Sequence, residues 1–482
     1  MNILLINPSQ ENVYGKIGTI TQPHIGLAYI GAVLEKEGHC VSLIDMDYDG
    51  ISYERLGKII SQQSFDIVGI TATTPVITSA IRVARTIKMA NPSVKVIIGG
   101  IHATIMPQML AKEPAIDFVV RGEGEATIRE LVKSIENRTD AENIAGLSYR
   151  KDGKIIETPE RALIDNLDEI PLPARHLFSK KQYRYPDTLY SPAFAIHTSR
   201  GCPGRCTYCQ AKNIYGYRVR FRSAESVAEE VEILIKDFKA REIHVWDDNF
   251  AANKERIFKI RDEIKRRGIS IAFSFTAGIR VDTACDERVL RAKREMGGYS
   301  IAFGIESGNQ GILDSIGKGI TLDQARQAVS LAKKLGFEVW AFFMLGFPDE
   351  NEQTMAETIA FAKELNPDVA KFHILKPYPG SKIFEEMKQE GLIDDLNYEN
   401  YGIHTFPVHH TRRASRATIY EYQKRAYRSF YIRPMIVLKQ MLRLRSTNRI
   451  FNNLRTALGV LRLIGRGKNK RSPSEFPSMM KR

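Results

Sequence analysis

Three cysteines, Cys202, Cys206 and Cys209, lie within eight residues of one another in the stretch "SRGCPGRCTYCQAK". Thiolates at such spacing bind metal, and no fourth cysteine is nearby. Structural zinc needs four ligands, and the one local imidazole, His197, precedes the group on a predicted strand. Three thiolates that hold a 4Fe–4S cluster leave one iron open for a substrate or a cofactor. The spacing therefore favours a reactive iron–sulfur centre over a zinc knuckle or unrelated surface cysteines.

The segment around the cysteines, residues 193–375, alternates apolar strands with helical stretches. Its six predicted strands are "AFAIHTS", "IHVWDD", "IAFSFTAG", "YSIAFGIES", "VWAFFMLG" and "AKFHIL". Consecutive βα units predict a (βα)6 partial TIM barrel, in which functional loops follow the carboxyl ends of the strands. The cysteines come directly after the first of these strands.

An earlier series of five strands occupies residues 1–145. These strands are "NILLIN", "CVSLID", "FDIVGIT", "VKVIIGG" and "IDFVV", and all five are apolar enough to be mostly buried. Helical segments such as "IGLAYIGAVLEKEG" separate them. The alternation predicts an α/β domain with a flavodoxin-like, doubly wound parallel sheet, whose ligand lies at the carboxyl ends of the strands.

The chain divides into four parts. We expect residues 1–145 to form the first domain and residues 146–192 a linker with a small hairpin that turns at Asp152 and Gly153. Residues 193–410 form the barrel and an extension. Residues 411–482 hold 19 Lys and Arg against 2 Asp and Glu, although the whole chain has a net charge of only +14. We expect a basic tail that is helical from 419 to 464, broken at Pro434, with a disordered end.

The tail has three alternative roles. No stretch of it reaches the ~20 apolar residues of a transmembrane helix. Its apolar stripe, flanked by Arg455, Arg462 and Arg466, favours an anionic membrane surface, with packing against the barrel and RNA binding as alternatives. No RNA-binding motif is visible, so no specific nucleic acid is expected. Without a secretion signal, we expect a cytoplasmic protein, peripheral at the inner face of the membrane if the tail docks there.

The cysteine motif CxxxCxxC, with Tyr208 before its last cysteine and a barrel strand before its first, resembles the radical SAM superfamily. The resemblance covers residues 193–375. It implies that Cys202, Cys206 and Cys209 bind three irons of a 4Fe–4S cluster and that S-adenosylmethionine (SAM) binds the fourth. Reductive cleavage of SAM would give a 5′-deoxyadenosyl radical that removes hydrogen from the substrate. We therefore expect an oxygen-sensitive, anaerobic enzyme that takes electrons from a donor such as flavodoxin or ferredoxin.

Two further segments bear on the amino-acid end of SAM. "WDDNF" stands where many family members carry Gly-Gly-Glu, so Asp247 and Asp248 are the candidates that hold the amino group. Arg280, at the end of the third barrel strand, can pair with the SAM carboxylate through two parallel hydrogen bonds.

Two later segments bear on the rest of SAM. Glu306 and Ser307 in "GIESG" occupy the position that contacts the ribose or the amino-acid end. Gly346 and Pro348 in "MLGFPDE" resemble the turn that cradles adenine. The alternative for Glu306 and Arg280 is a structural ion pair in the barrel mouth.

The sheet ahead of the barrel resembles the cobalamin-binding domain of cobalamin-dependent radical SAM enzymes. The stretches that carry this resemblance are "GITATTP", "IIGGIHAT" and "VVRGEGE". They place Thr71, Thr73, Gly99 and Gly100 beside the corrin, and Glu123 on the same edge of the sheet. A side chain in place of either glycine would block the approach of a ligand.

The cobalt-ligating motif Asp-x-His-x-x-Gly does not follow the first strand. His24 has the wrong spacing, and His102 is a weaker candidate ligand, so the lower face of cobalt is unassigned. A degenerate sheet without a corrin is the alternative. A methylthiotransferase needs three more cysteines ahead of the barrel, whereas Cys40 is alone on a predicted buried strand.

The resemblance extends to "YRSFYIRP" at 427–434 and includes the anaerobic magnesium-protoporphyrin ester cyclase group and class B radical SAM methyltransferases. The leading hypothesis is methylation of an unactivated carbon of a small-molecule substrate through methylcobalamin. Oxidative cyclisation or ring rearrangement is the alternative on the same architecture. Binding of the tail to a membrane would favour a lipid or other apolar substrate. A hypothesis of another class is a membrane-surface or RNA-binding protein with a degenerate catalytic core.

Overall fold

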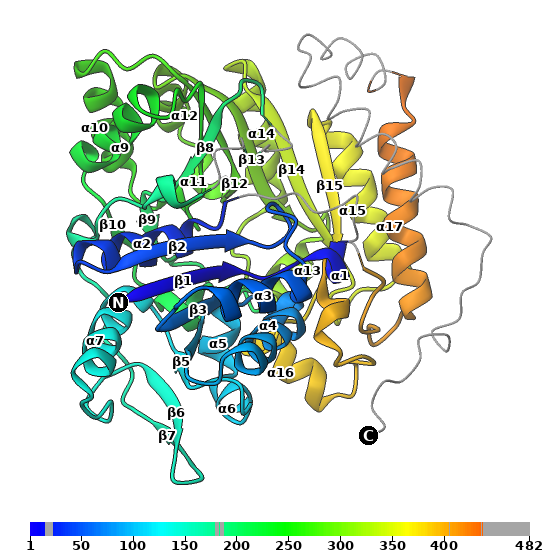
Figure 1. The fold of residues 1–482 in the computed structure, drawn as a ribbon. Coiled ribbons are helices and arrows are strands. Elements are labelled where there is room, and N and C mark those ends of the chain that lie inside the picture. Colours follow the sequence, from blue (N-terminus) through cyan, green and yellow to red (C-terminus); the bar gives the residue numbers. More distant parts are fainter. Residues whose placement is uncertain (15–22, 179–182, 184–187, 404, 435, 437–482) are drawn as a thin grey trace.

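Two sheets organise the chain, and helices cover both (Figure 1). The computed structural model describes residues 1–14, 23–178, 183, 188–403, 405–434 and 436. The N-terminal sheet has seven strands and the second sheet has six. Both predicted α/β units are therefore confirmed.

The five predicted strands of the N-terminal domain are all present and parallel. In the sheet order β2-β1-β3-β4-β5, they are β2 (Cys40–Asp45), β1 (Asn2–Asn7), β3 (Ile67–Thr71), β4 (Lys95–Gly99) and β5 (Phe118–Val120). The connecting helices are α1 (Glu11–Tyr14), α2 (Ile25–Lys36), α3 (Tyr53–Gln62), α4 (Ile77–Ala90), α5 (Ile101–Ile105), α6 (Pro107–Ala111) and α7 (Gly124–Asn137). Successive side chains of β1 point to opposite faces, so Leu4 packs with α3 and α4 whereas Leu5 packs with α2 and α7. This is a doubly wound sheet, whose strand order changes direction between β1 and β3.

Two local predictions differ from the structure. The second strand was expected to be buried, but β2 lies at the edge of the sheet, and Cys40 is exposed. The hairpin of β6 (Leu147–Lys151) and β7 (Lys154–Glu157) turns at Asp152 and Gly153, both with positive φ, as predicted. However, β6 pairs antiparallel with β5 and extends the first sheet, because Leu147 and Tyr149 are buried in the same core.

All six predicted barrel strands are also present and parallel. In the sheet order they are β8 (Ala193–Ile196), β11 (Glu242–Val245), β12 (Ala272–Ile279), β13 (Gly298–Glu306), β14 (Glu338–Leu345) and β15 (Val369–Ile374). The helices after them are α9 (Ala224–Lys236), α10 (Lys254–Arg266), α11 (Val281–Ala284), α12 (Glu287–Glu295), α13 (Gln310–Ser315), α14 (Leu322–Lys334), α15 (Glu352–Leu365) and α16 (Lys382–Gln389). Polar N-caps such as Ser223, Asn253 and Thr321 accept from first-turn N–H groups and so fix where these helices begin.

Helix α17 (Arg416–Tyr431) closes the free edge of β15. The hydroxyl of Tyr431 accepts from the N–H of Ala370 at 3.1 Å and donates to the carbonyl of Ala370 at 2.8 Å. The side-chain amide of Gln423 donates to the carbonyl of Phe372 at 2.8 Å. The predicted tail helix therefore begins at 416 rather than 419, and its first part packs against the barrel. Its predicted continuation, residues 437–464, lies outside the described residues.

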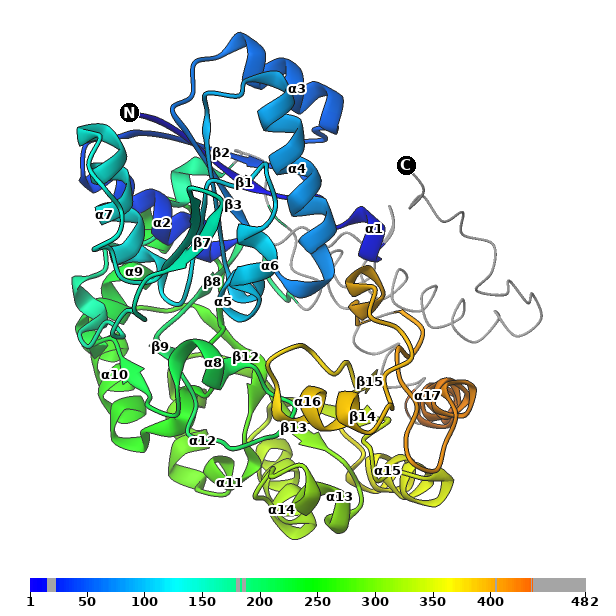
Figure 2. The same ribbon diagram turned by 90° about the horizontal axis from the view of Figure 1, so that it is seen from below.

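The N-terminal domain packs against the open side of the barrel. Ile25 and Tyr29 of α2 pack on Ala193 and Ala195 of β8. Helix α5, which follows β4, packs against α8 (Ala211–Tyr215), which follows the cysteines (Figure 2). The carboxyl end of β4 and the cysteine loop therefore meet at one interface.

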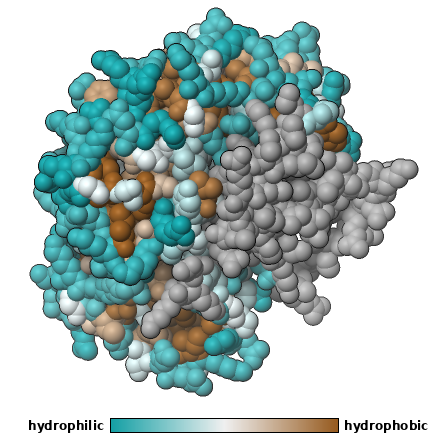
Figure 3. All heavy atoms as spheres, turned by 90° about the horizontal axis from the view of Figure 1, so that it is seen from above, coloured by the Kyte–Doolittle hydropathy of each residue, from teal (hydrophilic) through white to brown (hydrophobic). Residues whose placement is uncertain are grey.

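Figure 3 shows one face of the molecule, seen from above the view of Figure 1. The described residues on this face are mainly hydrophilic, with separate apolar patches among them. Large apolar side chains are exposed at positions such as Tyr190, Tyr217 and Ile432, which is ordinary for a globular protein. No helix of the described segments is long and apolar enough to cross a membrane.

Candidate active site

The three cysteines lie on one loop, residues 201–210, between the short strand β9 (Ser199–Arg200) and α8. All three cysteine residues are partly exposed. The N–H of Gly204 donates to Cys202 Sγ at 3.4 Å, and the N–H of Ala211 donates to Cys209 Sγ at 3.5 Å. A Cβ at Gly204 would lie 3.3 Å from Cys202 Sγ and 3.9 Å from Cys206 Sγ, so this glycine keeps the space between two thiols open.

The donor set fits a cluster better than a single ion. Burial raises the pKa of the Cys202 thiol, and raises that of Cys209 to about 11, so both thiols stay protonated until a metal replaces the proton. Within the described segments, no group of three His, Cys, Asp or Glu side chains can hold one metal ion. In an iron–sulfur cluster each thiolate binds a different iron, which allows a wider spacing.

Backbone and amide contacts pin the cysteine loop to the barrel. The N–H of Thr207 donates to the carbonyl of Ile316 at 2.9 Å, after α13. The side-chain amides of Gln210 and Asn213 donate to the carbonyls of Pro379 and Gly380, both at 2.7 Å. The loop is thus held between the segments that follow β13 and β15.

Buried arginines fix the chain just ahead of the loop, a feature that sequence reasoning missed. Arg175 of η3 (Arg175–Leu177) donates to the carbonyl of Ala195 at 2.6 Å. Arg222 donates to the carbonyl of His197 at 3.0 Å, and Arg256 to that of Thr198 at 2.6 Å. Because β8 is an edge strand, Arg175 supplies Ala195 with a hydrogen bond of the kind that a neighbouring strand would make, whereas Arg222 and Arg256 hold the two residues that follow the strand. Nothing local in the sequence marks these arginines.

The two predicted acidic residues after β11 have different surroundings. Asp247 is buried, and its carboxylate accepts from the N–H and hydroxyl of Thr198 and from the hydroxyl of Ser199, at 2.5–2.6 Å. Asp248 is exposed, and accepts from the N–H of Gly201 at 3.1 Å. Neighbouring protein atoms keep water from part of this carboxyl group, and this desolvation raises its pKa. Of the two candidates for the predicted contact with the SAM amino group, Asp248 is therefore the one that stays available.

Arg280 and Glu306 each form an ion pair in the barrel mouth, which is the alternative stated for them from the sequence. Arg280 Nη2 lies 2.9 Å from Asp282 Oδ2, while its Nη1 would lie 3.3 Å from a Cβ at Gly204. Glu306 is buried and pairs with Lys318 at 2.7 Å, and Lys318 also donates to the Tyr208 hydroxyl at 3.3 Å. Arg280 therefore lies beside the cysteine loop, and its contact with the SAM carboxylate stays a prediction. Lys318 is a neighbour of this loop that sequence reasoning missed.

The remaining predicted SAM residues are buried in the barrel mouth. Ser307 is fully buried, and its hydroxyl lies 3.2 Å from that of Thr358. Gly346 has a φ of 96°, and a Cβ there would lie 3.0 Å from His409 Nε2. Glu350 holds the turn before Pro348, because its carboxyl group accepts from the N–H groups of Gly346 and Phe347. The Ser307 hydroxyl is therefore already engaged within the protein.

The predicted cobalamin residues lie at the carboxyl ends of β3, β4 and β5, on the edge of the first sheet that runs across the strand ends. Thr73 and Gly100 are exposed, Gly99 is partly exposed, and Thr71 is buried with its hydroxyl 3.2 Å from His24 Nε2. Gly100 has a φ of 100°, and a Cβ there would lie 2.9 Å from the carbonyl of Ala72. The edge is therefore open at Thr73, Gly99 and Gly100.

The two other candidate cobalamin residues, Glu123 and His102, already have partners within the protein. Both oxygens of Glu123 accept from arginines of the barrel, so this buried carboxylate is held in the contact between the two domains. His102 is fully buried, with its Nδ1 3.1 Å from the hydroxyl of Thr74 and its ring against Tyr398. Burial lowers the pKa of His102 to about 4.

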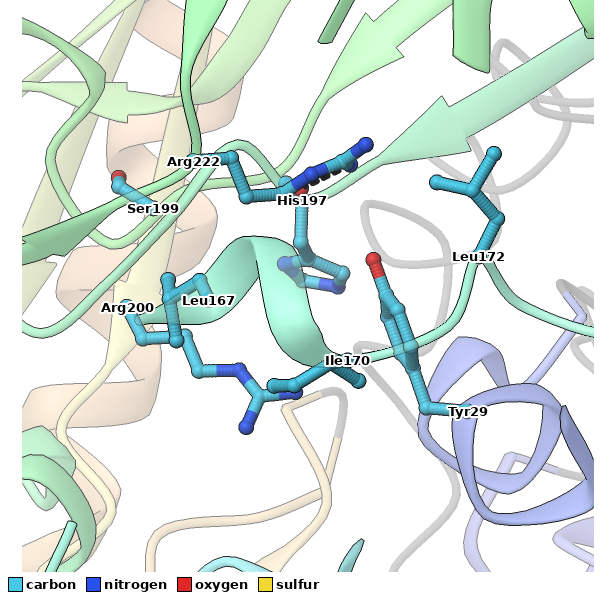
Figure 4. Close-up of a pocket in the computed structure, with 8 residues that line it drawn as sticks. All are labelled: Tyr29, Leu167, Ile170, Leu172, His197, Ser199, Arg200 and Arg222. Carbon is cyan, nitrogen blue, oxygen red and sulfur yellow. Dashed lines mark hydrogen bonds between the residues drawn. The ribbon is translucent and has the colours of Figure 1, made fainter. Parts of the chain in front are cut away.

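A small pocket lies where the two domains and the linker meet (Figure 4). It is lined by Tyr29, Leu167, Ile170, Leu172, His197, Ser199, Arg200 and Arg222. The imidazole of His197 and the hydroxyl of Tyr29 face the same space, and the guanidinium of Arg200 approaches from another side (Figure 4). Burial lowers the pKa of His197, so its ring is neutral near pH 7.

Both halves of the chain match known protein families. Residues 196–362 match the radical SAM superfamily, and residues 15–132 match the B12 binding domain. An uncharacterized methyltransferase of Pyrococcus horikoshii is 39% identical over 442 residues, which cover 92% of this chain and 95% of that protein. The chain belongs to the cobalamin-binding radical SAM enzymes. The resemblance seen in the sequence is thereby confirmed.

Other relatives of this cobalamin-binding radical SAM enzyme catalyse two kinds of reaction. The cytidylyl-2-hydroxyethylphosphonate methyltransferase of Streptomyces wedmorensis is 30% identical, over 81% of this chain and 82% of that protein. The anaerobic magnesium-protoporphyrin IX monomethyl ester cyclase of Rubrivivax gelatinosus is 29% identical, over 90% of this chain and 78% of that protein. The solved structure of OxsB with aqua-cobalamin and SAM bound supports the fold, with a TM-score of 0.72 at 18% identity over 96% of this chain and 72% of that one.

The cofactors of this cobalamin-binding radical SAM enzyme follow from its two domains. They are a 4Fe–4S cluster, SAM and cobalamin. The protein is a member of the cobalamin-dependent radical SAM methyltransferase family, and cyclases are also among its relatives. Such an enzyme acts on a small-molecule substrate and takes electrons from a donor.

Proposed function

We propose that the protein methylates an unactivated carbon of its substrate, in the space between the cysteine loop and the open edge of the first sheet. The observation that carries this proposal is the packing of α5 against α8, which brings the end of β4 next to the cysteine loop. A Cβ at Gly380 would lie 2.7 Å from Ile105 of α5 and 2.9 Å from Asn213 of α8, so the three segments meet closely. Two methyltransferases among the relatives support the reaction type.

We assign the following roles to residues of the chain. Asp248 accepts from the amino group of SAM, and Arg280 Nη1 donates to its carboxylate. The turn at Gly346 and Pro348 holds adenine by van der Waals contact of its backbone, because its N–H groups already donate to Glu350. When bound, the cluster and SAM supply hydrogen abstraction, and cobalamin supplies the methyl group. The protein orients the two groups and excludes water from the space between them.

The test is incubation of the anaerobically reconstituted enzyme with SAM carrying a labelled methyl group and an extract of cells that lack this protein. Mass spectrometry should find a product that has gained the label, together with 5′-deoxyadenosine. Cys202→Ala should lose iron and give neither compound, and enzyme prepared without cobalamin should give no labelled product. A product that has lost hydrogen and carries no label would overturn methylation in favour of cyclisation.

The substrate class and the location are further parts of this proposal. We propose an apolar or lipid substrate and a cytoplasmic enzyme that contacts the membrane surface through residues 411–482. The support is the cationic, amphipathic sequence of this segment. Vesicles rich in anionic lipid should sediment the full-length enzyme, and replacement of Arg455, Arg462 and Arg466 by Gln should reduce this binding. Equal sedimentation with neutral vesicles would contradict it.

A further inference from the structure

Arg200 connects the cysteine loop directly to the N-terminal domain. It stands two residues before Cys202, at the end of β9. Its Nη1 donates to Glu123 Oε1 at 2.8 Å, and its Nη2 donates to Glu125 Oε1 at 2.5 Å. A single guanidinium therefore bridges two carboxylates of the other domain, which a lysine cannot do with the same geometry.

A second arginine holds the same carboxylate from the other side. Arg220, which faces Arg200 across the antiparallel pair of β9 and β10 (Arg220–Phe221), donates to Glu123 Oε2 at 2.7 Å. The N–H of Ile164 in the linker donates to the same oxygen at 2.9 Å. Glu123 is 3% exposed and Arg220 is 1% exposed, so water does not compete for these contacts. We call Arg200, Arg220, Glu123 and Glu125 the interdomain ion network.

Both ends of this network are attached to cofactor-binding segments. On the barrel side, Gly201 follows with a φ of 96°, and a Cβ there would lie 2.3 Å from the carbonyl of Arg218. The buried Arg222 and Arg256 hold the preceding carbonyls. Gly201, closely packed against the Arg218 carbonyl, is the one residue between Arg200 and Cys202, so the position of Arg200 bears directly on the cysteine loop.

The other end of the network lies beside the open edge of the first sheet. Glu123 and Glu125 follow β5, the strand next to β4, which ends at Gly99. Glu125 lies in the first turn of α7, where its charge is favoured by the helix dipole. The network thus spans from the cysteine loop to the sheet edge that is open for the corrin.

We propose that Arg200 is a positioning residue that sets the distance between the cluster and cobalamin. The interdomain ion network holds the cysteine loop at a fixed distance from the segment that follows β5. This role goes beyond the proposed methylation, because a cyclase of the same architecture would need the same fixed distance.

The test measures this distance without any substrate. Full-length enzyme is reconstituted with iron, sulfide and hydroxocobalamin, and dithionite then brings the cluster and cob(II)alamin to paramagnetic states. Pulsed EPR gives the distribution of distances between the two. Arg200→Met should retain iron, sulfide and cobalamin but show a longer and broader distribution, and Arg200→Lys should lie between this variant and the wild type. Arg218→Met is the matched control, because Arg218 lies on the same segment and pairs only at the surface with Asp165.

The milder variant Glu125→Gln keeps the proposal falsifiable if Arg200→Met does not fold. Gln retains an acceptor but loses the charge, so the distribution should broaden while the cofactors stay bound. Distributions in Arg200→Lys and Glu125→Gln that match the wild type, with only a lower unfolding temperature, would show a merely structural role and overturn the proposal. This outcome is independent of whether the labelled methyl group reaches a product.

Discussion

Lys318 and Glu306 form a buried ion pair beside the cysteine loop, with Nζ and Oε1 2.7 Å apart. Their side chains are 7% and 11% exposed, respectively. Glu306 has a φ of 74°, where β13 shifts register against β14. Gly304 makes room for this arrangement, because a Cβ there would lie 2.7 Å from Glu306 Oε1. The pair therefore depends on a local distortion of β13.

Replacement of Lys318 by Met should destabilise the protein strongly. It leaves the Glu306 carboxylate buried without its partner, which costs about 3–5 kcal/mol. Urea unfolding of the cofactor-free protein measures this, and Glu306→Gln combined with Lys318→Met should recover part of the loss. Lys58→Met breaks the exposed pair with Glu54 and should leave the unfolding midpoint unchanged. Equal losses in the single and the double variant would contradict this account.

Replacement of Tyr431 by Phe should open the edge of β15. The N–H and the carbonyl of Ala370 would both lose their hydrogen bonds to the hydroxyl, which costs about 1–3 kcal/mol. Thermal unfolding measures the change. The control is Tyr422→Phe on the same helix, whose hydroxyl contacts the exposed Glu352. If both variants melt alike, the edge contact contributes nothing.

Glu350 should make the protein less stable as the pH rises. Burial raises its pKa from the ordinary value of 4.5 to about 8, so the folded state holds a proton that the unfolded state has released between these values. The free energy of unfolding therefore falls by up to about 1.4 kcal/mol per pH unit in this window. Glu350→Gln mimics the protonated group, so its advantage over the wild type should grow from pH 5 to pH 8. A constant difference across this range would refute the shift.

Lys293 should make the protein more stable as the pH rises, which is the opposite of the effect of Glu350. It is fully buried among Phe250 and Phe275, and burial lowers its pKa from 10.5 to about 7. Between these values the unfolded state binds the proton and the folded state does not, so the free energy of unfolding rises with pH. Lys293→Met should be more stable than the wild type at pH 7, by a margin that shrinks toward pH 10. Lys259→Met, at an exposed position of α10, should show no such trend.

Much of the fold was predictable because its signals are local. Each of the eleven strands of the two parallel arrays is a short apolar run, and the motif after β8 fixes three thiols at a set spacing. Cys40 was misplaced because an apolar pattern does not distinguish an edge strand such as β2 from a central one. The hairpin at Asp152 was found from its turn residues, but its pairing with β5 depends on burial of Leu147 and Tyr149.

The sequence by itself indicated the cofactors through its resemblance to cobalamin-dependent radical SAM enzymes, because the thiolate spacing and the strand pattern that carry this resemblance are set by neighbouring residues. The tertiary structure decided which polar residues remain available to these cofactors. Asp247 and Asp248 look equivalent in sequence. In the structure, however, the Asp247 carboxylate accepts hydrogen bonds from Thr198 and Ser199, whereas Asp248 is exposed. Glu123 pairs with Arg200 across 77 residues. Such contacts arise because buried charges and edge-strand carbonyls must find partners, and these partners become neighbours only when the two domains pack together.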